Sequence, residues 1–279
     1  MDFLDCYIAC RTADPAQLWD WIMDEDQELR YAAGRQLQHE QFAAIVSAIE
    51  ERLSLEFDPR SWEMMAFIIG QPQSQLTSDD IICICDILTR LLDSGNQAVT
   101  ASVICALGHL YSNDLLGEQD FCRFEQVIRV ACDRDDLDIR ISLLFAIAFF
   151  PHRNFLADYV LQQIQRSRQD PFASQMVPWV LFALEYGPYP SNEADSFLID
   201  IAGTAASDVA AEALAILLQR EVDAAVALAE EYCVQRESSL AEDTELEIHD
   251  EVLRSLADSR DERLHEIYQR LNAVIEAID

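Results

Sequence analysis

Residues 136–147 read DLDIRISLLFAI, and this stretch contains the pattern from which the fold of the whole chain follows. Asp136 is a residue type that favours the N-cap of a helix. Ile139 and Ile147 stand eight positions apart, with Leu143 midway between them. Residues four positions apart share one face of a helix. Residues 136–147 are therefore expected to form a helix that begins at a polar cap and is buried along one side.

The same pattern recurs along the chain. Its first residues, the anchors, stand at positions 29, 61, 99, 139, 176, 209 and 248, about 37 residues apart, which is in the range of helical-pair repeats. Three positions before five of the anchors stand residues suited to an N-cap: Asp26, Asp58, Asn96, Asp136 and Glu245. The positions four, five and eight after each anchor are small or apolar, so they are predicted to form the buried face.

A second amphipathic segment precedes the copies, so the repeating unit is expected to be a helical hairpin. These first helices are expected near 42–55, 80–92, 120–131, 155–164, 193–201 and 222–234. We predict one all-α domain over 1–279, with seven hairpins and a C-terminal capping helix. The hairpins are expected at about 14–39, 40–71, 78–112, 117–150, 153–187, 191–220 and 222–258, and the cap at 259–279.

Two copies carry a more specific motif. Asp26-x-x-Leu29-Arg30 and Asp136-x-x-Ile139-Arg140 resemble the HEAT-repeat family, in which an Asp before the second helix and an Arg four residues later form a ladder between repeats. The resemblance covers about residues 14 to 258 as a period. It implies a right-handed α-solenoid whose second helices line a concave surface. In that family such surfaces bind proteins, peptides or nucleic acids.

The charge of the chain narrows the class of partner. The chain has 51 acidic residues against 19 basic ones, all of them Arg, for a net charge of −32. Such a charge argues against direct binding to nucleic acid or to an anionic membrane, which Lys and Arg usually mediate. It favours a basic protein partner. High solubility without any such partner is the alternative interpretation.

The same sequence favours a cytoplasmic protein. The first five residues contain no basic segment typical of a secretory signal, and the longest apolar run, Leu143 to Phe150, is too short to span a bilayer. The eight Cys lie mostly within apolar helical patterns, where reduced thiols fit best.

The face opposite the buried stripe is unexpectedly aromatic in the middle of the chain. This face lies near positions two, six and ten after each anchor. Exposed apolar patches often mark interaction sites, so these residues are candidates for a partner-binding concave face; the alternative is a second layer of core. The candidates are Tyr31, Phe67, His109, Phe145, Phe149, Trp179, Phe182, Tyr186, Asp250 and Asp258.

No motif for catalysis, nucleotide binding or metal ligation occurs, so no catalytic residue, cofactor or metal is predicted and the protein is not expected to be an enzyme. The leading hypothesis is an acidic, protein-binding α-solenoid that recognises a basic protein, in its sharpest form a bacterial immunity or antitoxin-type inhibitor of a toxin such as a nuclease. The alternatives are a general scaffold or assembly adaptor and, second, a HEAT-like lyase-type enzyme.

Overall fold

The structure is a computed structural model that describes residues 3–55, 57–71, 75–167, 173–203, 208–241 and 248–278. These residues form sixteen α-helices, and no strand occurs among them. The expected all-α class is thus confirmed. The chain folds into two compact units, Met1–Leu156 and Ala157–Asp279. The expectation of a single domain over 1–279 stays a prediction.

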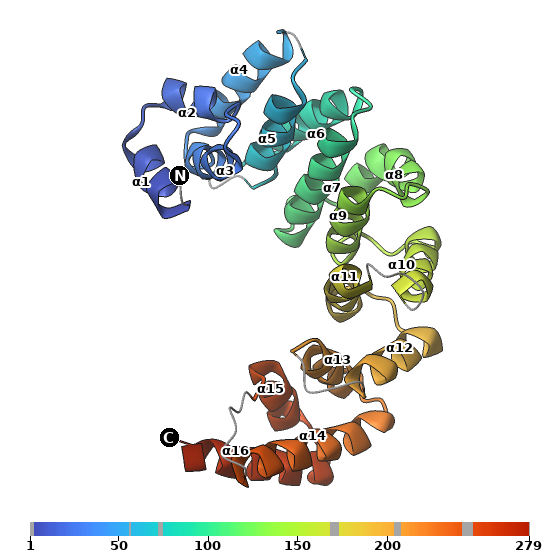
Figure 1. Cartoon of the computed structure of the whole chain (residues 1–279). Coiled ribbons are helices and arrows are strands. Elements are labelled where there is room, and N and C mark those ends of the chain that lie inside the picture. Colours follow the sequence, from blue (N-terminus) through green and yellow to red (C-terminus); the bar gives the residue numbers. More distant parts are fainter. Residues whose placement is uncertain are drawn as a thin grey trace. The chain divides into compact units, whose positions relative to one another are not determined.

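Unit 1 contains nine complete helices and the start of a tenth (Figure 1). They are α1 (Phe3–Thr12), α2 (Pro15–Trp21), α3 (Gln27–Leu37), α4 (Phe42–Leu53), α5 (Pro59–Gly70), α6 (Ser78–Leu92), α7 (Gln97–Ser112), α8 (Glu118–Cys132), α9 (Leu137–Ile147) and α10 (Asn154–Ser167). The first and second helices of the predicted hairpins lie within a few residues of their expected positions. Helix α1 precedes the first predicted hairpin and was not expected.

Polar side chains cap the second helices of unit 1 as the sequence predicts. Each accepts a hydrogen bond from a backbone N–H of the first turn: Asp26 from Leu29 (3.3 Å), Asp58 from Arg60 (3.0 Å), Asn96 from Val99 (3.2 Å) and Asp136 from Ile139 (3.1 Å). These bonds satisfy amide groups that a helix leaves without an internal partner. Glu245 lies outside the described residues.

The motif arginines contact the turns that precede their own helices. Arg30 donates to the carbonyl oxygens of Asp24 (2.7 Å) and Glu25 (3.1 Å). Arg140 is buried, and its guanidinium lies 3.9 Å from the carboxylate of Asp135. In both repeats the arginine therefore holds the inter-hairpin turn against the helix that follows it.

The second helices of unit 1 pack on one another in sequence order, α3 on α5, α5 on α7 and α7 on α9 (Figure 1). Small residues allow the closest approach. A Cβ added to Gly70 would lie 2.5 Å from Cβ of Ala106, and one added to Gly108 would lie 2.8 Å from Cα of Ala146. Ala106 and Ala146 each stand seven positions after their anchors, so the close approach recurs at the same place in two consecutive repeats. The repeat pattern thus corresponds to repeated helix packing in this unit.

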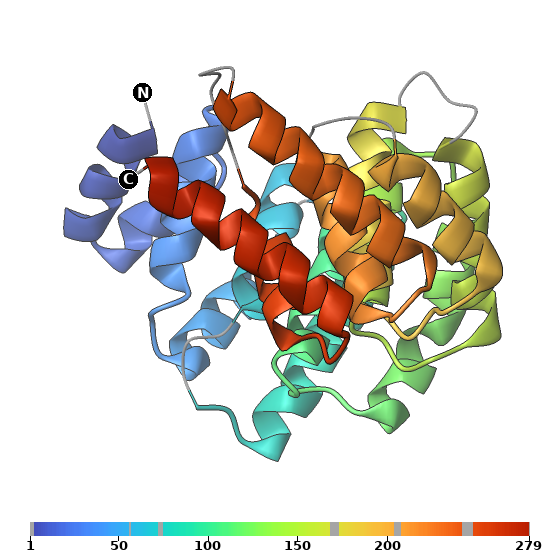
Figure 2. The same ribbon diagram turned by 90° about the horizontal axis from the view of Figure 1, so that it is seen from below.

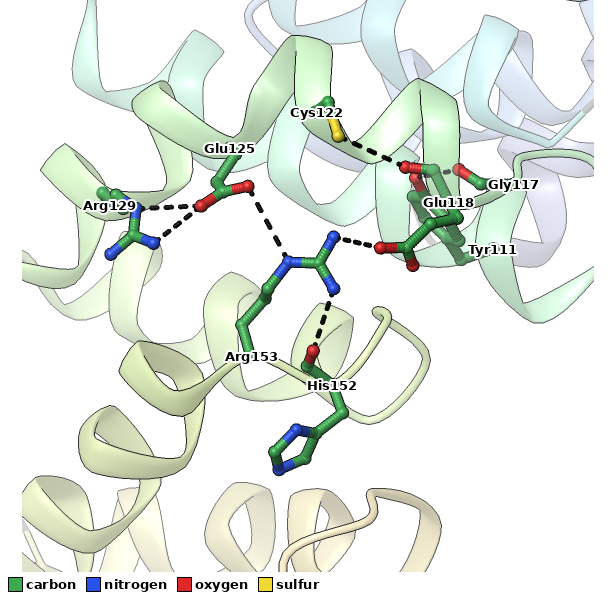
Figure 3. Close-up of polar contacts among 8 residues, drawn as sticks. All are labelled: Tyr111, Gly117, Glu118, Cys122, Glu125, Arg129, His152 and Arg153. Atoms are coloured by element: carbon green, nitrogen blue, oxygen red, sulfur yellow. Dashed lines mark hydrogen bonds and ion pairs between the residues drawn. The ribbon is translucent and has the colours of Figure 1, made fainter.

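Arg153 forms an ion-pair network near the end of unit 1 (Figure 3). It lies in the loop between α9 and α10. Its guanidinium pairs with the carboxylate of Glu118, lies 3.7 Å from that of Glu125, and donates to the carbonyl oxygen of His152. The same guanidinium lies 4.9 Å from the ring centroid of Phe121. The pKa of Arg153 is raised chiefly by its hydrogen bond to Glu118. Arg153 therefore ties the loop before α10 to α8.

Unit 2 contains the remainder of α10 and six further helices: α11 (Ala173–Tyr186), α12 (Asn192–Ala202), α13 (Asp208–Gln219), α14 (Ala224–Ala241), α15 (Asp250–Asp258) and α16 (Glu262–Ile278). Helix α13 packs against α11, α12 and α15, and α14 lies along α16 (Figure 2). Arg270 of α16 joins the last two by pairing with Glu230 (2.5 Å) and Glu237 (2.7 Å) of α14. A final helix is therefore present and packed, and its role as a cap stays a prediction.

Candidate protein-binding surface

In unit 1, the structure brings the predicted aromatic residues together in pairs. Tyr31 of α3 meets Phe67 of α5 edge to face, with ring centroids 5.2 Å apart. His109 of α7 lies 4.7 Å from Phe145 of α9, and Phe145 lies 5.5 Å from Phe149 just beyond that helix. All five side chains are half-buried. Adjacent second helices thus share aromatic contacts on a face that is neither fully exposed nor sealed as core.

Ionisable groups on this face of unit 1 are shifted towards their neutral forms. Burial is the main cause that raises the pKa of Glu63, on α5; the charge of Arg30 lowers this pKa and that of Asp138 raises it. Burial, followed by the charge of Glu63, raises the pKa of Tyr31, and burial lowers the pKa of His109. Water no longer fully stabilises the charge of a carboxylate that is partly desolvated beside aromatic rings. A cation that binds next to such a carboxylate therefore stabilises its ionised form.

In unit 2, the predicted aromatic residues lie along α11. Trp179 and Phe182 are half-buried, with ring centroids 6.4 Å apart, and Phe182 lies 4.8 Å from Tyr186. Tyr186 is 55% exposed, which is unusual for so large an apolar ring among the described residues of this unit. Large exposed apolar side chains in a group often mark a binding surface.

Carboxylates from three consecutive second helices of unit 2 interact electrostatically around this aromatic group. Burial and then Glu185 raise the pKa of Glu212 to about 7. Burial also raises the pKa of Glu185. A hydrogen bond with the Tyr186 side chain lowers this pKa, and the negative charge of Glu251 raises it. Glu251 belongs to α15, where it binds Arg254 at 2.9 Å. The sequence reasoning did not select Glu185 or Glu212, although an acid inside the apolar run of α13 was a usable signal.

The two predicted acidic residues lie elsewhere in unit 2. Asp250 and Asp258 are exposed, at the first and last positions of α15. Asp250 begins the helix, where a carboxylate is favourable for the helix dipole. Asp258 lines a cleft of about 560 Å³ that adjoins a second cavity of about 350 Å³. Asp258 therefore lies at the wall of this cleft, and its part in binding a partner stays a prediction.

The described residues were also searched for metal-ligand clusters and for membrane-spanning helices. No group of three His, Cys, Asp or Glu side chains in the described ranges is placed to hold a metal ion. No helix within those ranges is long and apolar enough to cross a membrane.

Comparison with known proteins relates the fold to a solved structure. No protein-family model matches the chain, and no curated protein matches it significantly. The X-ray structure titled YIBA_ECOLI, an Escherichia coli protein solved as a structural genomics target, is similar with a TM-score of 0.64. The alignment covers 99% of this chain and 96% of that one, at 16% sequence identity. The likeness establishes a shared all-helical fold.

Proposed function

We propose that the chain is an acidic HEAT-like α-solenoid that binds a basic protein through its second helices. The single observation that carries this proposal is the placement of carboxylates with raised pKa values beside aromatic side chains, which are half-buried in unit 1 and include the exposed Tyr186 in unit 2. Glu63 lies on the same helix as Phe67, and the side chain of Glu185 is hydrogen-bonded to that of Tyr186. Aromatic anchors supply most of the binding energy in many interfaces, and complementary charge supplies speed and selectivity.

The packing within each unit supports the solenoid form of the proposal, and the resemblance to HEAT repeats implies that the solenoid is right-handed. In unit 1, α3, α5, α7 and α9 are in consecutive contact, and in unit 2 the same holds for α11, α13 and α15. Capping side chains recur at the start of the second helices of unit 1. Stacked hairpins of this kind bury one continuous core and present one side chain row per repeat to a partner.

The sharper form of the proposal is an immunity or antitoxin-type inhibitor of a basic toxin such as a nuclease. Its support is the net charge of −32 on a chain without Lys. Such a charge speeds the capture of a basic protein. It also presents negative groups of the kind that a nuclease recognises in its own substrate. An inhibitor of this kind acts by occupying the partner's surface, so the proposal requires no catalytic group on this chain.

The test is purification of the tagged full chain from its source cells at low salt and at about 0.5 M salt, where screening acts within a few ångströms. The purified partner is then used for stopped-flow association and activity assays. The proposal predicts a basic partner whose association slows at least about tenfold at high salt and whose activity is blocked at a 1:1 ratio. Several salt-tolerant partners would favour the scaffold hypothesis, and an acidic partner would contradict the proposal.

A further inference from the structure

The two adjoining cavities of unit 2 form one cleft where the turn after α13 faces the loop between α15 and α16. Both cavities are lined by Leu218, Glu221, Ser259 and Arg260. Their volumes are about 350 and 560 Å³. Together they provide room for an extended side chain or a short segment of a partner, which is the scale of ordinary ligand pockets.

The floor of the cleft is aliphatic. Leu218 and Leu264 are each 6% exposed, and the half-buried side chains of Val222 and Val226 lie beside them. Water forms no hydrogen bonds with such a floor, so covering it with the apolar stem of a side chain is favourable. The floor therefore suits a side chain with a long aliphatic portion.

The rim of the cleft carries an excess of negative charge. It includes the exposed carboxylates of Glu221, Asp223, Asp258 and Asp261. Of the two cations on the rim, Arg254 is paired with Glu251 at 2.9 Å, whereas Arg260 forms no ion pair with any residue in the described ranges. An aliphatic floor beneath an acidic rim is complementary to a Lys or Arg side chain, whose stem is apolar and whose end is cationic.

The backbone holds Glu221 at the cleft at some cost. Its φ is +55°, in the left-handed region that glycine adopts most easily. The backbone N–H of Glu221 donates to Leu218 and that of Val222 to Leu217, which ends α13 in a Schellman motif with Glu221 at the usual glycine position. A carboxylate is thus kept at the rim in a place where a glycine would fit the backbone better.

From these observations we infer that this cleft binds an arginine or lysine side chain of the partner, with the aliphatic stem over Leu218 and Leu264 and the cationic end at the Glu221 and Asp223 carboxylates. The inference rests on the proposed function, because it takes the partner to be basic. It adds a specific site at the α13–α14 turn, separate from the aromatic residues of α11 and supplied by different elements.

The test uses the full chain and an acetylated, amidated tri-arginine peptide, with tri-glutamate as the opposite probe. Methyl NMR of Leu and Val follows binding, and thermal melting confirms that each variant is folded. We expect the methyl signals of Leu218, Val222, Val226 and Leu264 to shift with tri-arginine and not with tri-glutamate. E221Q/D223N should weaken binding about threefold to fivefold, in keeping with exposed ion pairs.

Two further variants make the test specific. Glu193 and Glu266 are exposed and do not line the cleft, so E193Q/E266Q is the charge-matched control and should leave binding nearly unchanged. R260Q should tighten binding of tri-arginine, because it removes the uncompensated cation. Tri-glutamate binding that R260Q abolishes, or no shift of the cleft methyls with tri-arginine, would overturn the inference. Tri-arginine shifts confined to α11 would overturn the cleft while leaving the proposed function standing.

Discussion

Gly70 of α5 lies so close to Ala106 of α7 that a Cβ on Gly70 would be 2.5 Å from Cβ and 2.7 Å from Cα of Ala106. The backbone of α7 supplies one of these contacts, so the neighbour cannot yield by a side-chain rotation alone. The same relation recurs between Gly108 and Ala146 one repeat later. Close helix approach at glycine is therefore a repeated element of the packing in unit 1.

G70A is predicted to destabilise the protein by about 1–3 kcal/mol, as overpacking of a tight contact does. Chemical denaturation with helical circular dichroism measures the change. The control is G203A, because Gly203 is exposed at the end of α12, has a φ of −81° and offers ordinary contact to an added Cβ. Equal stability of G70A and the wild type would show that α5 and α7 do not pack at this distance.

The sequence predicted the second helices well because their signal is local and repeated. The N-cap side chains and the buried positions four, five and eight after each anchor occur in the same order in almost every copy, and the structure confirms both in unit 1. Helix α1 was missed for a physical reason. Leu4 and Ile8 are largely exposed, whereas Cys6 and Cys10 are buried, so its apolar residues do not form one stripe.

The candidate surface could be predicted only in part. Most of the aromatic residues stand two, six or ten positions after their anchors, and this helical spacing identified their face. Glu185 and Glu212 stand at different offsets from their anchors, and only the packing of α11 on α13 brings their charges into interaction. The cleft unites Leu218 with Leu264 through a turn and a loop, and no periodic pattern in the sequence links such distant residues.

The raised pKa of Glu212, about 7 in the folded protein, predicts a specific pH dependence. An acid whose pKa is higher in the folded state than the ordinary 4.5 destabilises the fold when ionised. The penalty is absent below pH 4.5, develops as the pH rises towards 7 and is complete above it. The melting temperature of E212Q should match the wild type near pH 4.5 and exceed it by about 2 °C or more at pH 8. A difference between E212Q and the wild type that is the same at pH 4.5 and pH 8 would show that Glu212 titrates normally.

The backbone of Glu221 gives a second stability prediction. Because its φ is +55°, E221G should stabilise the protein by about 1 kcal/mol through relief of left-handed strain. D114G is the matched variant: Asp114, with φ +56°, ends α7 through the same pattern of backbone hydrogen bonds. Both should melt at higher temperature in differential scanning calorimetry. Only E221G should weaken tri-arginine binding, since Asp114 does not line the cleft.

Substitutions of Tyr186 and Phe145 are expected to affect partner binding and stability to different degrees. Y186A should change the stability by less than about 1 kcal/mol, because the side chain is 55% exposed, but should weaken the partner complex at least about tenfold if the ring is an anchor. F145A removes a half-buried ring that contacts both His109 and Phe149, so it should cost about 1–2 kcal/mol as well as affinity. Full partner affinity in Y186A would remove α11 from the proposed surface.

The most direct measurement of the central claim places a photo-cross-linking amino acid, benzoylphenylalanine, at Tyr186 in the full chain within its source cells. Val234 of α14 is the control position, because it is 46% exposed in the same unit but lies on a first helix. The proposal predicts a cross-link from position 186 to one basic protein, lost at high salt, and none from position 234. Equal cross-links from both positions, or an acidic protein joined at position 186, would contradict it.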